Sequence, residues 1–414
     1  MSDIATPRSM PARWYRIASA ANGEIAVNPV EGSLESVAVR DGRLVGPHVR
    51  VETRAVIVED AGDAGLRGRA VDPLVPRKGT LCFDPATGGI RTRENRRARG
   101  AFNGIVAEAN RFGMVNAYVH ADIAVQYANT LLADLGAPAL PTLTVVVGAH
   151  FGSRLPGFAE GDGDFRTGEL RPMSGGHYRL SARTTVVPEP FPVAPTGEIH
   201  LGPSRYRKPF AGSMSYLRNA AHNPAIVYHE FAHHLCRHTA DFRCNDERRP
   251  DRQRNGKPGV EEGICDYFTA ALLGSGRPYG WYRADRGSRR DVDRPRAAVR
   301  THHDAHAIGA AWAAAFWRCR ATLVDNCFLG SPVDHDRAVV ATLLRIRELG
   351  RGGSRRTRSR RSAQRCDPWT VITTYIDTLA DAAGARAASP ALAIFERTGL
   401  VEQKGVDHAG AAPC

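Results

Sequence analysis

The sequence lacks several features that would place it in common protein classes. No apolar run in its 414 residues approaches the ~18 residues that a transmembrane helix requires. Its eight cysteines include no C-x-x-C pair, which argues against a zinc site built from cysteines alone. Residues 1–16 contain no apolar stretch typical of a secretory signal. We therefore expect a cytoplasmic protein with no membrane span. Secretion is the alternative if the true start lies upstream or if export is non-standard.

The composition indicates a globular chain with a strong excess of arginine. At 43% hydrophobic residues, the chain is long enough for two or three domains with sizeable cores. Its net charge of +13 comes mainly from basic runs at residues 248–257, 283–300 and 351–365. The last run is of low complexity and could bind a polyanion such as nucleic acid. Solvated insertions are the favoured interpretation of such runs, so nucleic acid is an unlikely partner.

One short motif, H-E-x-x-H at residues 229–233, predicts a metal site. Residues four apart lie on one face of a helix, so His229 and His233 can bind one Zn²⁺. Glu230 then lies beside the open coordination position, where it can accept a proton from water. Asn223 followed by Pro224 predicts the start of this helix, because Asn is a good N-cap and Pro suits the first helical position.

A metal site of this kind needs a third protein ligand. Continuation of the motif as H-x-x-G-x-x-H fails, because Cys236 stands in place of Gly and Thr239 in place of His. A second helix is predicted by Pro258 and Gly259 at its start and Gly274 at its end. A carboxylate on this second helix is the better candidate.

Within the second helix, Glu262 and Asp266 are four residues apart and share a face. Glu262 is the candidate third ligand, and Asp266 can accept the second N–H of a ligating histidine. Glu261 is a neighbouring rival, but it does not share the face of Asp266. The alternative is an acidic first turn stabilised by the helix dipole.

Three segments together resemble a known family. H-E-F-A-H at residues 229–233, E-G-I-C-D-Y-F at 262–268 and the H-A-I-G-A-A-W-A segment from His306 are similar, in this order, to the thermolysin-like (gluzincin) zinc metallopeptidases. The fungalysin branch is the nearest match, over roughly residues 110–400. In that branch the histidine matching His306 stabilises the oxyanion. His302 and His303 are nearby rivals for this role.

The resemblance implies an α+β fold with a two-lobed catalytic unit. Residues 1–100 would form a β-rich, possibly propeptide-like region, residues 101–275 the lobe with the zinc helix, and residues 276–414 a helical lobe. The implied activity is zinc-dependent endopeptidase cleavage of a peptide or protein substrate. The alternative is an inactive binding protein that keeps this fold. The family's oxyanion tyrosine is absent between Arg243 and Glu261. His306 would therefore act alone or with another donor, such as Tyr267.

Periodicity predicts the remaining elements. A hairpin with Asp41-Gly42 at its turn is expected at residues 37–45. Strands are expected at 49–58, 143–147, 178–187 and 197–201. Of these, residues 198–201 are, by the same resemblance, the candidate edge strand that pairs with substrate. A helix is expected at 114–135, with its core row at 115, 119, 123, 127, 131 and 135; His120 on it is assigned to packing or surface. Further helices are expected at 307–324, 337–349, 368–382 and 390–397.

Two further features have open interpretations. Cys236 with Cys244, and Cys319 with Cys327, are plausible local disulfides, with free thiols as the alternative. The acidic stretch at residues 161–164 could bind Ca²⁺, but a turn is favoured because no suitably spaced bidentate Glu follows. The oligomeric state and the substrate preference are not encoded in any motif that we identified.

Overall fold

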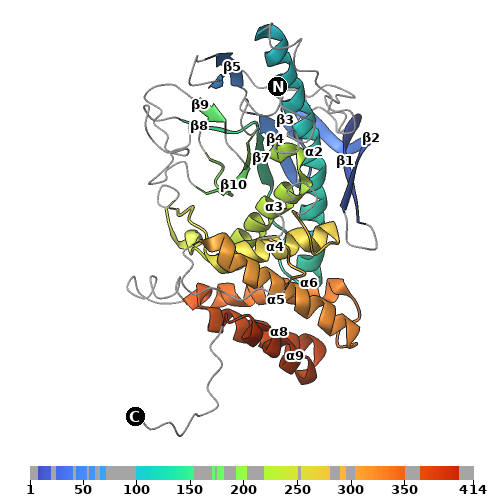
Figure 1. Ribbon diagram of the computed structural model, residues 1–414, viewed down its shortest axis with the longest axis vertical. Coiled ribbons are helices and arrows are strands. Elements are labelled where there is room, and N and C mark those ends of the chain that lie inside the picture. Colours follow the sequence, from blue (N-terminus) through green and yellow to red (C-terminus); the bar gives the residue numbers. More distant parts are fainter. Residues whose placement is uncertain are drawn as a thin grey trace, which may run out of the picture. The chain divides into compact units, whose positions relative to one another are not determined.

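The computed structural model describes residues 8–19, 25–40, 43–53, 56–60, 66–70, 99–152, 170–172, 175–180, 193–202, 219–249, 253–279, 290–294, 304–349 and 364–400. The chain is a mixture of helices and strands, as expected for an α+β protein (Figure 1). It divides into two compact units. The first comprises residues 1–130, 138–235 and 247–255, and the second comprises residues 131–137, 236–246 and 256–414. Helix α3 (Pro224–His238) belongs to both units, since the division falls between Leu235 and Cys236.

A seven-stranded sheet forms the framework of the first unit. Within the described residues its spatial order is β1 (Arg8–Ser19), β2 (Ile25–Arg40), β3 (Arg43–Val45), β4 (Val49–Thr53), β7 (Leu143–Val147), β11 (Glu198–Leu201) and β10 (Gly176–Arg179). Strand β7 runs parallel to both of its neighbours, β4 and β11, and the remaining pairs are antiparallel. The β7 sequence, L-T-V-V-V, is a β-branched run of the kind that suits a central parallel strand.

The sheet confirms some predictions and corrects others. The hairpin at residues 37–45 is confirmed, because Val39 of β2 pairs with Leu44 of β3. Residues 198–201 form a strand, but β11 lies between β7 and β10, so the prediction of an edge strand there is wrong. Strand β10 occupies that end of the sheet. The single strand predicted at 49–58 is two strands in different sheets, because β5 (Val56–Asp60) joins β6 (Leu66–Ala70), β9 (Leu170–Pro172) and β8 (His150–Gly152).

The long helix α2 (Arg99–Asp134) packs against this sheet. The side chain of Asn116 accepts a hydrogen bond of 2.9 Å from the backbone N–H of Tyr15 in β1. A Cβ added to Gly113 would lie 3.1 Å from a methyl group of Val147 in β7, so the helix backbone lies close to the sheet. The predicted core row is confirmed only in part: Val115 and Leu131 are buried, but Ile123 is 47% exposed. The buried face is instead rich in alanine, with Ala117, Ala121, Ala124, Val125 and Ala128.

Helices make up the described part of the second unit. They are α4 (Gly259–Leu273), α5 (Ala305–Asp325), α6 (Pro332–Glu348), α8 (Pro368–Ala383) and α9 (Ala388–Arg397). Their bounds agree with the predicted ranges to within a few residues, and their starts follow from capping. Ser331 and Asp367 accept hydrogen bonds from the backbone N–H groups of Asp334 and Thr370, and a proline follows each of the two caps.

Helices α4 and α5 approach each other closely at glycines. A Cβ added to Gly309 would lie 2.8 Å from Glu262 Cβ and 2.9 Å from the backbone nitrogen of Gly263. A Cβ added to Gly263 would lie 2.3 Å from Trp312 Cβ. The glycines of the E-G and H-x-I-G segments therefore have a direct steric role, because they allow the two backbones to meet beside Glu262.

Tyr267 is buried in the core of the second unit, where its hydroxyl has polar partners. Its hydroxyl lies 2.6 Å from His335 Nδ1 and donates to the Asp336 carboxylate, while His335 Nε2 lies 2.6 Å from the Tyr375 hydroxyl. Burial lowers the pKa of His335 to about 3, so this imidazole is neutral at physiological pH. These contacts do not support the prediction that Tyr267 replaces the missing oxyanion donor.

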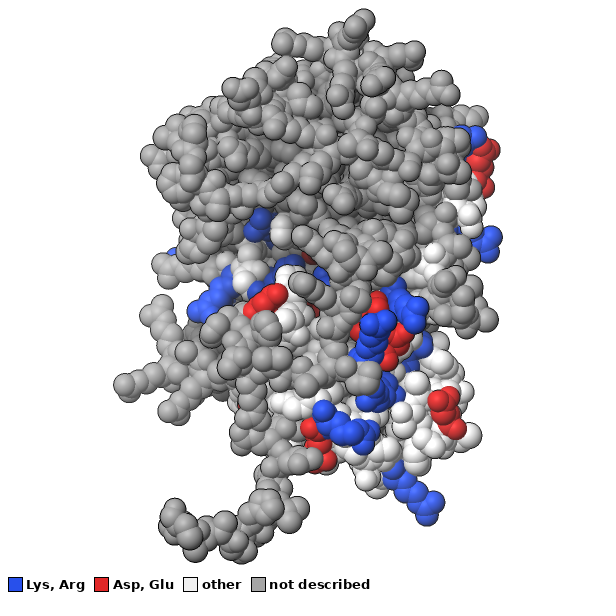
Figure 2. Space-filling model, viewed as in Figure 1, with Lys and Arg blue, Asp and Glu red and all other residues white. Residues whose placement is uncertain are grey.

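Several described arginines on the surface of the second unit lie beside carboxylates. Arg345, Arg337 and Arg347 have nitrogen–oxygen distances of 2.6 to 2.7 Å to Asp381, Asp134 and Asp246, respectively. On the face drawn in Figure 2, acidic side chains accompany the basic ones. Arg365, at the end of the basic run, is buried and donates to the carbonyl oxygen of Asp241 at 3.2 Å. None of the described helices is both long and apolar enough to span a membrane.

The remaining predictions concern disulfides and segments that lie outside the described residues. The six cysteines that the structure describes are free thiols, so the predicted pairs Cys236–Cys244 and Cys319–Cys327 are wrong. The candidate Ca²⁺ stretch at residues 161–164, the rivals His302 and His303, residues 181–187 of a predicted strand and residues 351–363 of the basic run lie outside the described residues.

Candidate metal centre

The H-E-x-x-H motif lies in the middle of α3, where its local sequence favours a helix. The side chain of Asn223 accepts a hydrogen bond of 3.0 Å from the N–H of Ala225, and Pro224 occupies the first helical position. The segment then continues without Gly or Pro to residue 238. The predicted start of this helix at Asn223 and Pro224 is therefore confirmed.

Three polar contacts fix the rotation of α3 within the first unit. The Tyr228 hydroxyl lies 2.9 Å from Nδ1 of His120 on α2. On another side, His234 lies 2.9 Å from the Tyr178 hydroxyl in β10 and 3.0 Å from the Pro141 carbonyl oxygen. Burial lowers the pKa of His120 to about 4, which fits the predicted packing role of this histidine. With His234 held by these two partners, the face of α3 that carries His229 and His233 is defined.

The two histidines of the motif lie together on that face. The ring centroids of His229 and His233 are 5.0 Å apart, with the ring planes perpendicular. Both side chains and that of Glu230 are buried. The first residue of β10, Gly176, lies against Glu230: a Cβ added there would be 2.6 Å from Glu230 Cγ and 3.0 Å from its Oε1. The absence of a side chain at Gly176 therefore leaves room for the Glu230 carboxylate.

The two adjacent glutamates of α4, Glu261 and Glu262, have different partners. Glu261 forms a buried, two-contact ion pair with Arg243, whose Nε lies 2.9 Å from Glu261 Oε2. Glu262 instead has its Oε2 at 3.4 Å from Nε2 of His306 and its Oε1 at 3.8 Å from Nζ of Lys257. Gly274 ends the helix in the left-handed conformation, as predicted. Glu262, not Glu261, is therefore the glutamate that faces His306.

His306 stands in the first turn of α5, where its position is set by the helix cap. Asp304 accepts a hydrogen bond of 3.0 Å from the backbone N–H of His306, and this bond lowers the pKa of the Asp304 carboxyl. The same carboxylate lies 3.2 Å from Nδ1 of His306. Both ring nitrogens of His306 thus face a carboxylate, Asp304 on one side and Glu262 on the other.

Asp266 has partners that the sequence did not identify. Its Oδ1 accepts a 2.8 Å hydrogen bond from the Tyr279 hydroxyl, and its Oδ2 accepts one of 2.9 Å from Nε of Arg290. The guanidinium of Arg290 also lies 4.4 Å from the centroid of the Tyr279 ring. These contacts hold the Asp266 side chain in place. Its predicted hydrogen bond to a ligating histidine remains a prediction.

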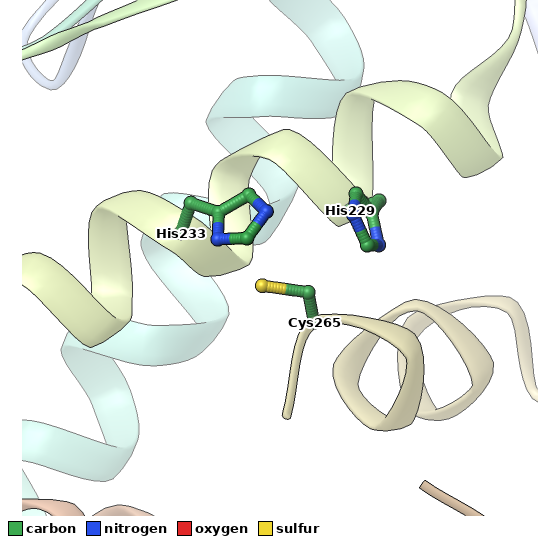
Figure 3. A group of neighbouring side chains, drawn as sticks. All are labelled: His229, His233 and Cys265. Carbon is green, nitrogen blue, oxygen red and sulfur yellow. The ribbon is translucent and has the colours of Figure 1, made fainter. Parts of the chain in front are cut away.

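Among the residues that the structure describes, two groups bring ligand atoms within 4.8 Å of one another. The first consists of His229, His233 and Cys265, all of them buried, and Figure 3 shows the Cys265 side chain pointing from α4 toward the two rings. The second consists of His229, Glu262 and His306. All of the predicted site residues apart from Glu230 and Asp266 therefore occur in these groups. Neither group contains all three predicted ligands.

Cys265 is the residue that the sequence analysis missed. Its thiol is hydrogen-bonded to that of Cys236, which lies on the last turn of α3, and both thiols are buried. Burial raises the pKa of the Cys265 thiol well above its ordinary value in the metal-free protein. A signal was present in the sequence, because Cys265 is three residues after Glu262 and hence on a neighbouring position of the same helical surface.

The donor types in these groups are those that zinc accepts. Imidazole nitrogen, thiolate sulfur and carboxylate oxygen are its usual protein ligands. Ca²⁺ and Mg²⁺ prefer sets of oxygen atoms, which this cluster does not supply. The residues present therefore fit a buried zinc ion better than a hard cation.

A comparison with known protein families, with characterised proteins and with solved structures finds no match for this chain. The functional argument therefore depends on the residues and geometry described above.

Proposed function

We propose that this chain is a zinc-dependent peptidase that uses a metal-activated water to cleave peptide bonds. The observation that carries the proposal is that buried His229 is grouped with His233 and Cys265 and, separately, with Glu262 and His306, while Glu230 follows His229 on the same helix. The sequence resemblance to the fungalysin branch of thermolysin-like peptidases supports the same activity. A two-lobed, thermolysin-like catalytic unit is part of this proposal.

In this proposal His229, His233 and Glu262 hold the ion. When bound, Zn²⁺ supplies a Lewis acid that lowers the pKa of a water molecule and polarises the scissile carbonyl. Glu230 accepts the proton of the attacking water through its carboxylate and then passes it to the leaving amine. Burial restricts the carboxylate, and the absence of a side chain at Gly176 leaves the space that it occupies.

His306 would donate a hydrogen bond toward the negative charge that develops on the carbonyl oxygen. A fixed donor at such a position lowers the barrier, because the charge exists only in the transition state. The contact between His306 Nε2 and Glu262 supports this role, since it places the ring beside a proposed metal ligand. Asp304 orients the ring through Nδ1. Asp266 would hold a ligating histidine through its second ring nitrogen.

The proposal is tested by Glu230→Gln, with zinc content and hydrolysis of an unfolded protein measured on the same sample. We expect zinc to be retained and the rate to fall by about 10²- to 10⁴-fold, the usual contribution of a general base. Glu348→Gln, at an exposed position on α6, is the matched control and should keep the full rate. A Glu230→Gln protein with unchanged activity would disprove the mechanism.

A second function is favoured by one observation, the presence of a thiol in the cluster. If Cys265 joins His229, His233 and Glu262 on the ion, four protein donors leave no position for water, as in structural zinc sites. The chain would then be a binding protein stabilised by its metal. Wild-type protein that contains stoichiometric zinc but hydrolyses no peptide, with or without chelator, would support this second function.

A further inference from the structure

We propose that Cys265 is itself a metal ligand, whose thiolate binds the same ion as His229 and His233. This inference rests on the proposed metal site and adds to it a residue that the H-E-x-x-H pattern does not include. If Glu262 binds the ion as well, the four protein donors favour the second function over hydrolysis. The observation behind the inference is that one ring nitrogen of His229, one ring nitrogen of His233 and the Cys265 sulfur all lie within 4.8 Å of one another (Figure 3).

Helix geometry supports this placement independently. Residues 229, 233 and 236 follow the i, i+4, i+7 spacing and therefore lie along one face of α3. Cys236, the last of the three, has its thiol hydrogen-bonded to that of Cys265 on α4. Both cysteines belong to the second unit. This contact places the Cys265 sulfur against the face of the helix that carries the histidines one and two turns earlier.

Helix α4 thus offers two donors, and they differ in their surroundings. Glu262 has contacts with His306 and Lys257 and is grouped with His229 but not with His233. Cys265 is grouped with both histidines of the motif. The sulfur is therefore the α4 donor that the geometry relates most directly to the histidine pair.

Binding of the ion by Cys265 requires the loss of the thiol proton. The thiol loses its proton to the solvent as the sulfur–metal bond forms, so one proton is released for each ion bound through this residue. A thiolate is a soft donor, which favours Zn²⁺ over Mg²⁺, Ca²⁺ or Mn²⁺. The metal preference of the site is therefore expected to reflect sulfur as well as nitrogen.

Substitution with Co²⁺ provides a direct test, because a cobalt–thiolate bond gives a charge-transfer absorption in the near ultraviolet that nitrogen and oxygen ligands do not give. The metal-free full chain is titrated with Co²⁺, and absorption is recorded for the wild type and for Cys265→Ser. Cys236→Ala is the matched control, as it removes the neighbouring buried thiol. Cys327→Ser removes an exposed thiol.

We expect the absorption in the wild type and in both controls, and its loss in Cys265→Ser. Zinc affinity should also fall in Cys265→Ser by more than the roughly 10- to 100-fold that removal of an outer-shell partner costs. Should Cys265→Ser not fold, absence of the band in the wild type would still overturn the inference, and loss of the band in Cys236→Ala would overturn it as well.

The outcomes also separate this inference from the proposed function. Stoichiometric Co²⁺ that depends on His229 but gives no thiolate band would overturn the role of Cys265 and leave the peptidase proposal intact. A band that disappears in Cys236→Ala but not in Cys265→Ser would assign the cobalt–thiolate bond to Cys236 and would also overturn the inference. Failure of the wild type to bind any Co²⁺ or Zn²⁺ would overturn both proposals.

Discussion

Two adjacent glutamates at the start of α4 are expected to respond to the same substitution in opposite ways. Glu261 is paired with Arg243, and Glu262 faces His306. We predict that Glu261→Gln lowers stability and keeps zinc, whereas Glu262→Gln loses zinc. The two changes are chemically identical and one residue apart, so each is the control for the other.

The expected loss in Glu261→Gln follows from burial. Both Glu261 and Arg243 are at least 95% buried, with 2% and 5% of their surface exposed, so water cannot compensate the charge that remains. Removal of one partner from such a pair costs about 3–5 kcal/mol. For a unit of 150–250 residues this corresponds to a decrease in melting temperature of roughly 6–20 °C.

Thermal unfolding with and without zinc separates the two effects. Bound metal raises the melting temperature through mass action, since it binds only the folded state. Without zinc, the melting temperature of Glu261→Gln should therefore be lower than that of the wild type, but it should rise by a similar amount when zinc is added. The melting temperature of Glu262→Gln should rise little or not at all.

The reverse pattern would refute the reasoning. If Glu261→Gln lost zinc while Glu262→Gln retained full occupancy, the register of α4 that pairs Glu261 with Arg243 would be incorrect. The ligand role would then pass to Glu261.

Three further predictions concern other parts of the molecule. Gly176→Val should displace the Glu230 carboxylate and reduce hydrolysis while zinc content stays unchanged, because the new side chain would overlap it; an unaltered rate would contradict this. Gly309→Ala should cost about 1–3 kcal/mol by overpacking and weaken zinc binding, because its Cβ would lie 2.8 Å from Glu262 Cβ; equilibrium unfolding and metal titration measure both. The folded state lowers the pKa of His335 from 6.5 to about 3, so the unfolded state binds more protons between these values and stability falls as the pH falls through this range. His335→Gln should make that pH dependence shallower in denaturation curves, and an identical pH dependence would contradict the assignment.

Local signals in the sequence predicted the helices that carry the site. Asn223 and Pro224 marked the start of α3, and Gly274 marked the end of α4. These signals act over one helical turn, through caps and backbone conformations that depend on neighbouring residues alone. The same holds for the hairpin between β2 and β3, whose turn residues specify it locally.

Predictions that needed long-range information were less successful. The i, i+4 row on α2 was regular, yet the buried face is the alanine-rich one, because the helix backbone lies close to the sheet and small residues permit that approach. Cys236 was paired with Cys244 by proximity in sequence. The structure instead places its thiol against that of Cys265, a residue of a different helix that is far from it in the sequence. Strand β11 was assigned to an edge, but strand order depends on which strands pair across the whole sheet.

The sequence by itself predicted His229, His233 and Glu262 as donors and the helices that present them, because spacing along a helix follows from covalent geometry. Only the tertiary structure decided how the donors are combined. It paired Glu261 with Arg243, placed Glu262 beside His306 and brought the Cys265 sulfur to the two histidines. Those choices depend on tertiary packing, such as the close approach of α4 and α5 at Gly263 and Gly309, which brings together segments far apart in the sequence.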